Sequence, residues 1–322
     1  MAVPVSLAVP VYNGQAYLAQ TLDSLLAQTF PDFEIIITDN ASTDATQEIC
    51  QSYASRDRRI RYVRNDANLG AAGNFNRGFA LSKGEFFKWC AHDDLLSPDF
   101  LERCVRALRD DPTAIIAHGR QQLIDAEGRT LSGTTGDLLD ISDATDPAER
   151  FGLVFRTQGF DAAMFGLFRS SMLARTSLHR PYYSSDIALL AECALLGRFT
   201  ATEAVFYNRE HAVRSVNIQD KIQRHIWHTG TRPTRPKCEH LWLLAHFLEM
   251  ATRPPHGVPR RRILPQVLAW AARPRQLARY GLELLALASP RCAGSLKTTG
   301  KRVLLGLHRS REPDRRMARP RP

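Results

Sequence analysis

Short apolar runs alternate with segments of helical spacing over the first 110 residues, and this alternation constrains the fold more than any other feature of the sequence. The runs are rich in β-branched residues and end at polar turn residues, which is typical of buried strands. They cover residues 5–11, 33–38, 60–63 and 86–91. Because parallel strands need crossover connections, the pattern predicts an α/β fold with a mostly parallel sheet flanked by helices.

Local signals predict where the connecting helices begin and end. Asp44, with Gln47 three residues later, resembles a capping box at the start of one helix. Gly84 is placed to end the preceding helical segment in the left-handed conformation. Ser97 followed by Pro98 predicts a further helix with the proline at its first position.

The pattern is more mixed after residue 110. It predicts a strand at 114–117, a hairpin around Gly128, a helix opening at Asp146, a strand-like segment at 163–168 and a helix over 187–196. We therefore predict one α/β unit over 1–215, with halves at about 1–110 and 111–215. A basic helical region at 216–308 and a disordered Arg/Pro-rich tail at 309–322 would follow.

The net charge of +10 belongs to the C-terminal third. Residues 1–208 carry 19 Lys and Arg against 26 Asp and Glu, whereas residues 209–322 carry 24 against 7. Such a segment suits an anionic membrane surface or a nucleic acid, or is simply a solvated helical surface. No apolar run reaches the length of a membrane span and no signal peptide is evident, so we expect a cytoplasmic protein. Its six scattered cysteines fit reduced, small apolar side chains.

Polar residues follow three of the predicted strands at the point where each strand ends. They are Tyr12-Asn13-Gly14, Asp39-Asn40 and His92-Asp93-Asp94. Ligands of open α/β sheets bind beyond the carboxyl ends of the strands. A hard cation such as Mg²⁺ or Mn²⁺ takes carboxylate and phosphate oxygens. If the three strands are neighbours, these groups predict a site for a nucleotide diphosphate and a divalent cation.

The motifs at these strand ends resemble those of a known family, the inverting family-2 nucleotide-sugar glycosyltransferases with the GT-A fold. The match is specific over about residues 4–100 and continues more weakly to about 215. The segments that carry it are AVPVYNG at 8–14, IITDNASTDAT at 36–46, NLG at 68–70, KGE at 83–85 and CAHDD at 90–94. The resemblance implies a Rossmann-like mixed, mostly parallel sheet flanked by helices.

The resemblance also implies roles for individual residues on the donor side. Pro10 and Tyr12 would line the nucleobase pocket, with Asn13 and Asn68 along the same nucleotide-sugar site. Asp39 would bind the base or ribose, although an Asx turn is the simpler alternative for this residue. Asp93 would reach the Mg²⁺ or Mn²⁺ ion as the last aspartate of the family's DxD motif.

The sequence departs from the family pattern at the first position of that motif. Ala91 replaces the first aspartate and His92 fills the middle position. The change bears on how tightly a metal is held and on which metal is preferred.

On the acceptor side, the resemblance makes Asp186 the general base, in an acidic pair that is reduced here to Ser185-Asp186. Simple capping of the following helix is the alternative for this residue. His211 would be a second metal ligand and Arg214 a phosphate partner. The usual zinc spacings are not reproduced by His225, His228, Cys238 and His240. We expect His225 and His228 to lie on a helix surface beside Trp227.

Together these features predict an inverting glycosyltransferase that moves a sugar from a nucleotide-diphospho-sugar to an acceptor hydroxyl, with UDP favoured as the nucleotide. The expected setting is synthesis of surface polysaccharide or glycolipid on a saccharide or lipid-linked acceptor, peripheral at the inner face of the membrane. The alternatives are an inactive transferase-like protein and a basic protein that binds nucleic acid or a membrane surface, although no nucleic-acid motif is recognisable.

Overall fold

A computed structural model describes residues 3–135, 141, 143–154, 161–210, 221–233, 238–252 and 257–288. The strands are β1 Val5–Val11, β2 Phe33–Asp39, β3 Ile60–Arg64, β4 Phe86–Trp89, β5 Leu95–Leu96, β6 Ala114–Ile124, β7 Thr130–Thr135, β8 Leu167–Arg169 and β9 Arg198–Arg209. The helices are α1 Leu18–Leu26, α2 Thr46–Arg56, α3 Gly70–Leu81, α4 Phe100–Asp110, α5 Pro147–Val154, α6 Asp161–Met164, α7 Ser170–Leu173, α8 Ser185–Leu196, α9 Lys221–Thr229, α10 Glu239–Thr252, α11 Arg260–Ala271 and α12 Pro274–Ala288.

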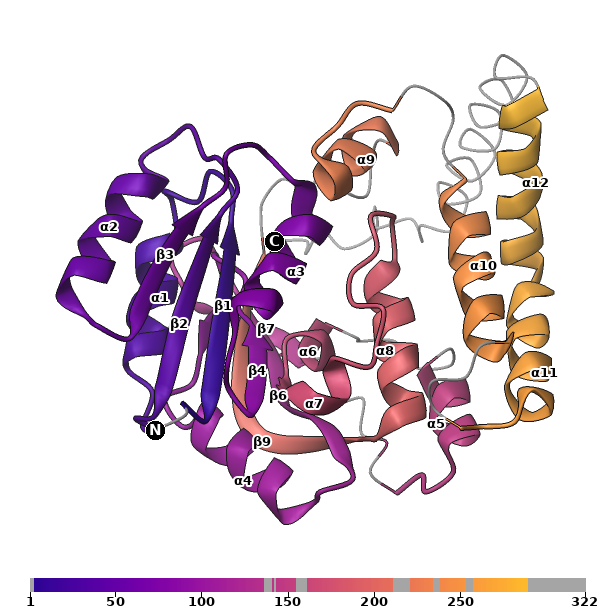
Figure 1. The fold of residues 1–322 in the computed structure, drawn as a ribbon, viewed down its shortest axis with the longest axis horizontal. Coiled ribbons are helices and arrows are strands. Elements are labelled where there is room, and N and C mark those ends of the chain that lie inside the picture. The colour runs from indigo at the N-terminus through magenta and orange to yellow at the C-terminus, as the bar shows by residue number, and fades with distance from the viewer. Residues whose placement is uncertain are drawn as a thin grey trace, which may run out of the picture.

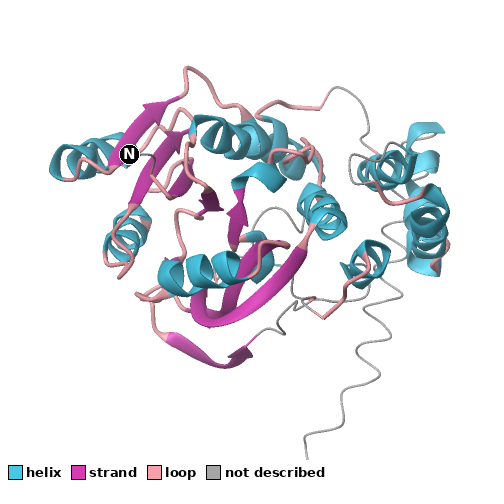
Figure 2. Cartoon of the chain, turned by 60° about the horizontal axis from the view of Figure 1, so that its bottom comes forward, coloured by secondary structure: helices cyan, strands magenta, loops and turns pink. Residues whose placement is uncertain are grey.

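These nine strands belong to one mixed sheet. Its order is β3-β2-β1-β4-β8-β6-β9-β5, with β7 paired to β6 outside this path. The first four positions pair in parallel, as do β6 and β9, whereas β8 runs antiparallel to both of its neighbours. Helices cover both faces of the sheet (Figures 1 and 2). The α/β architecture predicted from the sequence is confirmed.

Each face of the sheet contributes to its own apolar core. Alternate residues of β1 divide between them, so that Leu7 and Val9 pack with α1 and α4, while Ala8 packs with Phe87 and Trp89 on the other face. The second core also takes in side chains of α5, α8, α10 and α11. A central strand that is buried on both faces explains why β1 is an uninterrupted apolar run.

The C-terminal helices form a layer beside α5 and α8, at the right of Figure 1. Helix α10 contributes Leu243, Phe247, Met250 and Ala251, which recur at helical spacing, to the core shared with α8. The ring of Phe247 meets that of Phe151 at 6.4 Å and that of Trp270 at 5.0 Å. None of the helices in the described ranges is long and apolar enough to cross a lipid bilayer. The predicted boundary near residue 215 and the predicted tail at 309–322 fall outside the described residues and stay predictions.

Several local predictions were wrong by a few residues. Ala45 rather than Asp44 is the N-cap of α2, and the Asp44 carboxylate instead accepts the N–H groups of Thr46 and Gln15. Helix α4 begins at Phe100, because Ser97 and Pro98 form the turn that joins β5 to it. The segment 163–168 is not one strand: helix α6 ends at 164 and β8 begins only at 167. The short β5 and the long β9 were not predicted.

Gly84 has a different role from the predicted one. Helix α3 is followed by Ser82 in an extended conformation, and the described glycines with positive φ are Gly70, Gly128, Gly230 and Gly257. Gly84 instead packs against the start of β1. A Cβ atom there would lie 2.6 Å from the Ser6 nitrogen and 2.7 Å from the Phe86 carbonyl oxygen.

We expect Gly84→Ala to destabilise the protein by about 1–3 kcal/mol, because the new methyl group would force apart the backbones of β1 and β4. Urea unfolding followed by circular dichroism measures this change. Gly281→Ala is the matched control: a Cβ atom added at this exposed position of helix α12 would meet nothing within 4 Å. It should be neutral or stabilising by up to about 1 kcal/mol. Equal effects of the two substitutions would contradict the packing argument.

Candidate functional site

The polar segments after β1, β2 and β4 lie along one edge of the sheet. The backbone hydrogen bonds at the ends of these parallel strands place the three segments side by side. The Asn40 N–H donates to the Val11 carbonyl, the Asn65 N–H to the Asp39 carbonyl and the Cys90 N–H to the Ala8 carbonyl, each at 2.8 Å. Since the strands are adjacent and parallel, the predicted convergence of these segments is confirmed.

The loop after β1 is tied to the loop after β2. Asn13, with a φ of 53°, donates its N–H to the Ser42 hydroxyl at 2.9 Å and accepts the Thr43 N–H at 2.8 Å. The Gly14 N–H donates to the Thr46 hydroxyl at 2.8 Å. Pro10 is buried within β1, whereas the Tyr12 side chain is 46% exposed. Tyr12 is therefore a solvent-facing ring on a loop held by hydrogen bonds, and its predicted place in a nucleobase pocket stays a prediction.

His92 lies over this loop. A Cβ atom on Gly14 would be 2.8 Å from Cδ2 of the His92 ring. The glycine therefore allows the loop after β4 to contact the loop after β1 directly. The CAHDD segment and the Tyr12 loop form one continuous rim.

Asp39 is the fully buried carboxylate at the end of β2. It accepts the Ser42 N–H at 2.9 Å, the Tyr62 hydroxyl at 2.7 Å and Arg64 at 2.6 Å. Burial alone would raise its pKa, but the hydrogen bonds from Ser42, Tyr62 and Arg64 outweigh burial and hold the pKa of Asp39 below its ordinary value. The side chain is thus a fixed anion, and its two partners on β3 were not predicted.

Asparagine side chains support the rim between β2 and α3. Asn40 accepts the Leu69 N–H at 2.8 Å and donates to the Asn68 side-chain oxygen at 2.8 Å. That oxygen also accepts the N–H of Gly70, the first residue of α3, at 2.8 Å. The structure thus shows Asn68 as a loop-bracing residue beside the site, and its predicted contact with the nucleotide sugar stays a prediction.

The two carboxylates of the CAHDD segment occupy different environments. Asp94 is buried and accepts the Arg209 N–H at 2.9 Å and the Asn208 side-chain amide at 3.2 Å. Burial, followed by repulsion from Asp93, raises the pKa of Asp94 to about 7. Asp93 is half-buried at the rim. Asp94 therefore braces the turn, and Asp93 is the member of the pair positioned to meet a ligand.

Arg209, at the end of β9, ties this turn to distant parts of the chain. Its guanidinium donates to the carbonyl oxygens of Asp93, Asp125 and Ala126 at 2.7–2.8 Å and to the Gln20 side chain at 2.8 Å. It also lies 4.4 Å from the centre of the Tyr17 ring. The predicted site residues His211 and Arg214 follow directly in the chain and lie outside the described residues.

Asp186 lies in the first turn of α8, two residues after Ser184, whose φ is 66°. One carboxylate oxygen accepts the Ile187 N–H at 2.9 Å. Because α8 begins at Ser185 with Ser184 as its N-cap, Asp186 lies inside the first turn and is not the capping residue of the alternative interpretation. The same residue lines a cavity of about 260 Å³. The cavity lies between α3, residues 164–165, the start of α8, and α9. Most of the residues that line it were not predicted from the sequence. The aromatic and ionisable lining residues are Phe75, Phe165, His179, Tyr183, Asp186, Trp227 and His228.

A buried polar network fixes the segment that precedes Asp186. The His246 ring, on α10, pairs with the Tyr182 hydroxyl through Nδ1 and with the Glu192 carboxylate at 3.1 Å through Nε2. The other oxygen of Glu192 accepts the Ser177 N–H at 2.6 Å. Helix α10 therefore contacts the chain on both sides of Asp186, at Tyr182 and at Glu192.

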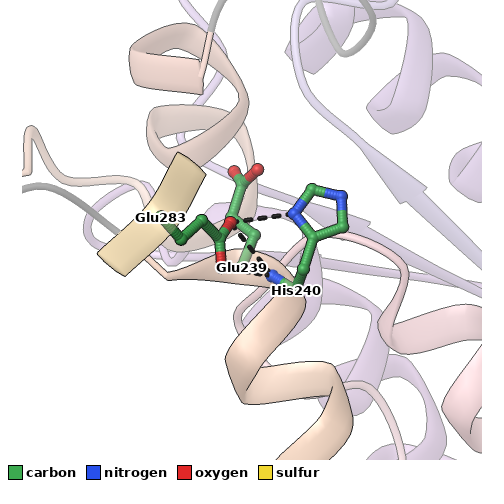
Figure 3. Close-up of side chains that lie close together, drawn as sticks. All are labelled: Glu239, His240 and Glu283. Atoms are coloured by element: carbon green, nitrogen blue, oxygen red, sulfur yellow. Dashed lines mark hydrogen bonds and ion pairs between the residues drawn. The ribbon is translucent and has the colours of Figure 1, made fainter. Parts of the chain in front are cut away.

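One cluster of metal-binding residue types lies away from this rim. Glu239, His240 and Glu283 bring their ligand atoms within 4.8 Å of one another (Figure 3). Glu239 is paired with Arg224 at 2.7 Å, and Glu283 accepts the His240 ring at 2.8 Å and the Leu241 N–H at 3.1 Å. These contacts pair the three side chains with protein groups and link α9, α10 and α12 to one another. His225 was expected on a helix surface but is buried.

A family model described as "Glycosyl transferase family 2" matches residues 6–172, which is more than half of the 322-residue chain. The chain therefore belongs to this family. It is 37% identical over 130 residues to a Rickettsia felis protein named "Uncharacterized glycosyltransferase". That match covers 39% of this chain and 21% of the relative, so most of the relative's length lies outside it.

Solved structures support the same fold. The S. aureus TarS fragment 1-349 in complex with UDP-GlcNAc matches 88% of this chain and 81% of its own, with a TM-score of 0.62 at 15% identity. The mannosyltransferase PcManGT of Pyrobaculum calidifontis, in complex with GDP-Man and Mn²⁺, matches 95% of this chain and 81% of its own, with a TM-score of 0.53 at 20% identity. At these identities the likeness shows the fold, which is GT-A.

We expect Asp39→Asn to destabilise the protein by about 1–3 kcal/mol at pH 7, because the fully buried side chain would lose the charge that its hydrogen bonds from Tyr62 and Arg64 depend on. The folded-state pKa of Asp39 lies below 3.8, so its carboxylate stabilises the fold above pH 3.8 and loses this effect as the pH falls through the folded-state pKa. The difference between wild type and variant should therefore shrink in acid. Urea unfolding at several pH values tests this.

Asp57→Asn is the control for that comparison. Asp57 also pairs with an arginine, Arg59 at 2.7 Å, but both side chains are partly exposed. Its loss should cost no more than about 1 kcal/mol. A difference for Asp39→Asn that stays constant as the pH is lowered well below 3.8 would contradict the assignment of a depressed pKa.

Proposed function

We propose that this protein is an inverting glycosyltransferase that transfers a sugar from a nucleotide-diphospho-sugar to an acceptor hydroxyl. The observation that carries the proposal is the continuous rim formed by the Tyr12 loop, Asp39 and the CAHDD segment in a chain of glycosyl transferase family 2. In a sheet of this type, the carboxyl ends of the strands are where ligands bind.

Two groups at the rim bear on nucleoside binding: the aromatic ring of Tyr12 and the carboxylate of Asp39. Tyr12 presents an exposed aromatic face on a loop held by hydrogen bonds to Ser42 and Thr43. Asp39 keeps its charge, but its buried carboxylate is covered by the Ser42 N–H, Tyr62 and Arg64, so a base N–H or a ribose hydroxyl would bond it by displacing one of these partners. UDP is the nucleotide we favour, and the UDP-GlcNAc complex of the TarS fragment, a structural neighbour, supports this choice.

The residues present fit a hard divalent cation next to a diphosphate. Asp93 supplies one carboxylate, and its repulsion already contributes to the raised pKa of Asp94. A positive ion at this turn would relieve that repulsion. Ala91 supplies no ligand, so the diphosphate itself would complete most of the coordination of Mg²⁺ or Mn²⁺. When bound, such an ion acts as a Lewis acid toward the departing diphosphate. The Mn²⁺ complex of PcManGT, a protein of the same fold, supports the proposal.

Asp186 is the proposed general base. In a single displacement, the acceptor hydroxyl attacks the anomeric carbon and its proton passes to the Asp186 carboxylate, while the bond from that carbon to the diphosphate oxygen breaks. Asp186 lines a cavity with room for a substrate, and its own helix start holds the carboxylate in one orientation. A base positioned in this way contributes about 10²–10⁴ in rate.

The cellular setting stays a prediction. Exposed leucines at positions 277, 284 and 287 lie along α12, which also carries the exposed Arg275. Apolar and basic side chains on one amphipathic helix are compatible with an anionic membrane surface and a lipid-linked acceptor.

The donor site is tested by thermal unfolding with UDP, GDP, dTDP and CDP, each with and without Mn²⁺. We expect one nucleotide to raise the melting temperature in a metal-dependent manner, because binding to the folded state alone stabilises it. Asp93→Ala should abolish the metal-dependent part of the shift. Asp99→Ala is a matched control, since Asp99 pairs with Arg103 on the surface of α4. If no nucleotide stabilises wild type, the donor assignment fails and an inactive transferase-like protein is the better description.

The base is tested by Asp186→Asn. Release of nucleotide from the donor should fall by about 10²-fold or more in kcat, while nucleotide binding stays within about twofold of wild type. Asp146→Asn is the control, because Asp146 likewise lies at a helix start and accepts an N–H of that helix, at Ala148, but does not line the Asp186 cavity. Unchanged kcat in Asp186→Asn would remove this residue from the mechanism.

A further inference from the structure

The side chain of Lys88, on β4, lies entirely within the apolar core of the sheet. It is 0% exposed, and it shares its face of the strand with Phe86 and Cys90, which belong to the core that packs with α1 and α4. Lysine is almost never fully buried unless it is paired with an acid. The proposed chemistry does not use this residue.

The amine of Lys88 makes one hydrogen bond within the described part of the chain. Its Nζ atom donates to the main-chain carbonyl of Phe165, and it lies 4.7 Å from the centre of the Phe100 ring and 5.5 Å from that of Phe206. Among the residues that the structure describes, no carboxylate forms an ion pair with it. An amine donates such a bond with or without its extra proton, so the link between β4 and Phe165 does not depend on the charge.

This arrangement does not serve the stability of the fold. Burial lowers the pKa of Lys88, because the core disfavours the charged form. The two aromatic faces offset only part of the desolvation. Replacing a buried charge by an apolar side chain of similar volume is often neutral or stabilising. Folding alone therefore does not account for a lysine at this position.

The carbonyl that Lys88 holds belongs to the wall of the Asp186 cavity. Phe165 lines this cavity. The next residue, Gly166, packs closely on β6, where an added Cβ atom would lie 2.7 Å from the Ile116 side chain. This part of the wall is therefore held from β6 by packing and from β4 by the Lys88 hydrogen bond.

The same strand leads to the CAHDD segment. Cys90, the first residue of that segment, follows Lys88 by two positions and donates its N–H to the Ala8 carbonyl at 2.8 Å. Lys88 also lies close enough to the buried Asp94 for their charges to attract each other. One side chain thus joins the strand that carries the CAHDD segment to the wall of the cavity that Asp186 lines.

We propose that Lys88 is a positioning residue that fixes the separation between the CAHDD segment and the wall of the Asp186 cavity, through the Phe165 carbonyl. The proposal deepens the proposed function and rests on it, because the CAHDD segment would hold the donor diphosphate and Asp186 would take the acceptor proton. Transfer needs these two groups at a fixed distance, and a misplacement of about 1 Å costs about 10²-fold in rate. Lys88 therefore acts on the rate of transfer and not on the affinity for the donor.

The test compares Lys88→Met with wild type, both as the full chain. Methionine is nearly as long as lysine and removes the hydrogen bond to Phe165. Nucleotide release is measured from UDP-glucose, UDP-galactose, UDP-N-acetylglucosamine and GDP-mannose. With the donor that wild type uses, kcat should fall at least about tenfold while KM for the donor stays within about twofold. Lys88→Gln, which keeps an N–H donor, should retain more of the rate.

Thermal unfolding separates this role from a structural one. Lys88→Met should melt at or above the wild-type temperature, because it removes a buried amine from an apolar place. Arg150→Met is the matched control, since Arg150 is also buried and donates to three main-chain carbonyls, those of Ala144, Thr145 and Ala194, but does not line the Asp186 cavity. It should lower the melting temperature and leave kcat of the folded protein within about twofold.

Hydrogen exchange reports on the wall without any need for activity. The Gly166 N–H donates to the Ala163 carbonyl at 3.1 Å, one residue after the carbonyl that Lys88 holds. In Lys88→Met this amide should exchange at least about tenfold faster, while the amides of β1 keep their wild-type rates.

The proposal is overturned if Lys88→Met keeps the wild-type kcat or the wild-type exchange rate at Gly166. It is also overturned if the variant melts well below wild type or does not fold, because the lysine would then serve the fold itself. These outcomes differ from failure of the proposed function, in which wild type neither binds a nucleotide nor releases one from any donor. In that case the role of Lys88 in transfer falls with the function on which it rests.

Discussion

The in-register parallel pairing of β2, β1 and β4 is the constraint on which the site depends. Val11 pairs with Asp39 and Ala8 with Trp89, so the three strands end on the same edge of the sheet. The two faces of β1 bury side chains of different size, Leu7 and Val9 on one and Ala8 on the other, so a shift of one residue would exchange them between the two cores. The Tyr12 loop, Asp39 and the CAHDD turn are adjacent because the core permits only this alignment.

Arg209 links these strand ends to the second half of the sheet. Its guanidinium meets three carbonyl groups and one side-chain amide from segments that lie far apart in the sequence. A planar group with five donors can satisfy this many acceptors at once, and a lysine could not. Together with the Asn208 side-chain amide, which bonds Asp94, Arg209 holds the CAHDD turn from the β9 side. The chain that follows Arg209 leads directly to the predicted phosphate-side residues His211 and Arg214.

The rim formed by the Tyr12 loop, Asp39 and the CAHDD segment was largely predictable from sequence, and the Asp186 cavity was not. Strand ends are local signals, so Tyr12, Asp39 and Asp93 were found from runs of apolar residues followed by polar turns. Tyr62 and Arg64 were missed as partners of Asp39 because their pairing depends on the neighbouring strand. His179 and Trp227 lie about fifty residues apart and meet only through the packing of α9 on α3, for which the sequence offers no periodic signal.

The C-terminal helices show why charge alone was a poor guide to their role. A net charge of +17 after residue 208 suggested a separate basic surface, yet α10 and α11 contribute Phe247, Ile263 and Trp270 to the apolar core of the sheet. His246 reaches from α10 to Tyr182 and Glu192, beside the segment that carries Asp186. Removing these helices would expose that core and release the Asp186 segment. With their inner side, the C-terminal helices therefore support the segment that carries Asp186 and lines its cavity, whatever their basic residues meet on the outer side.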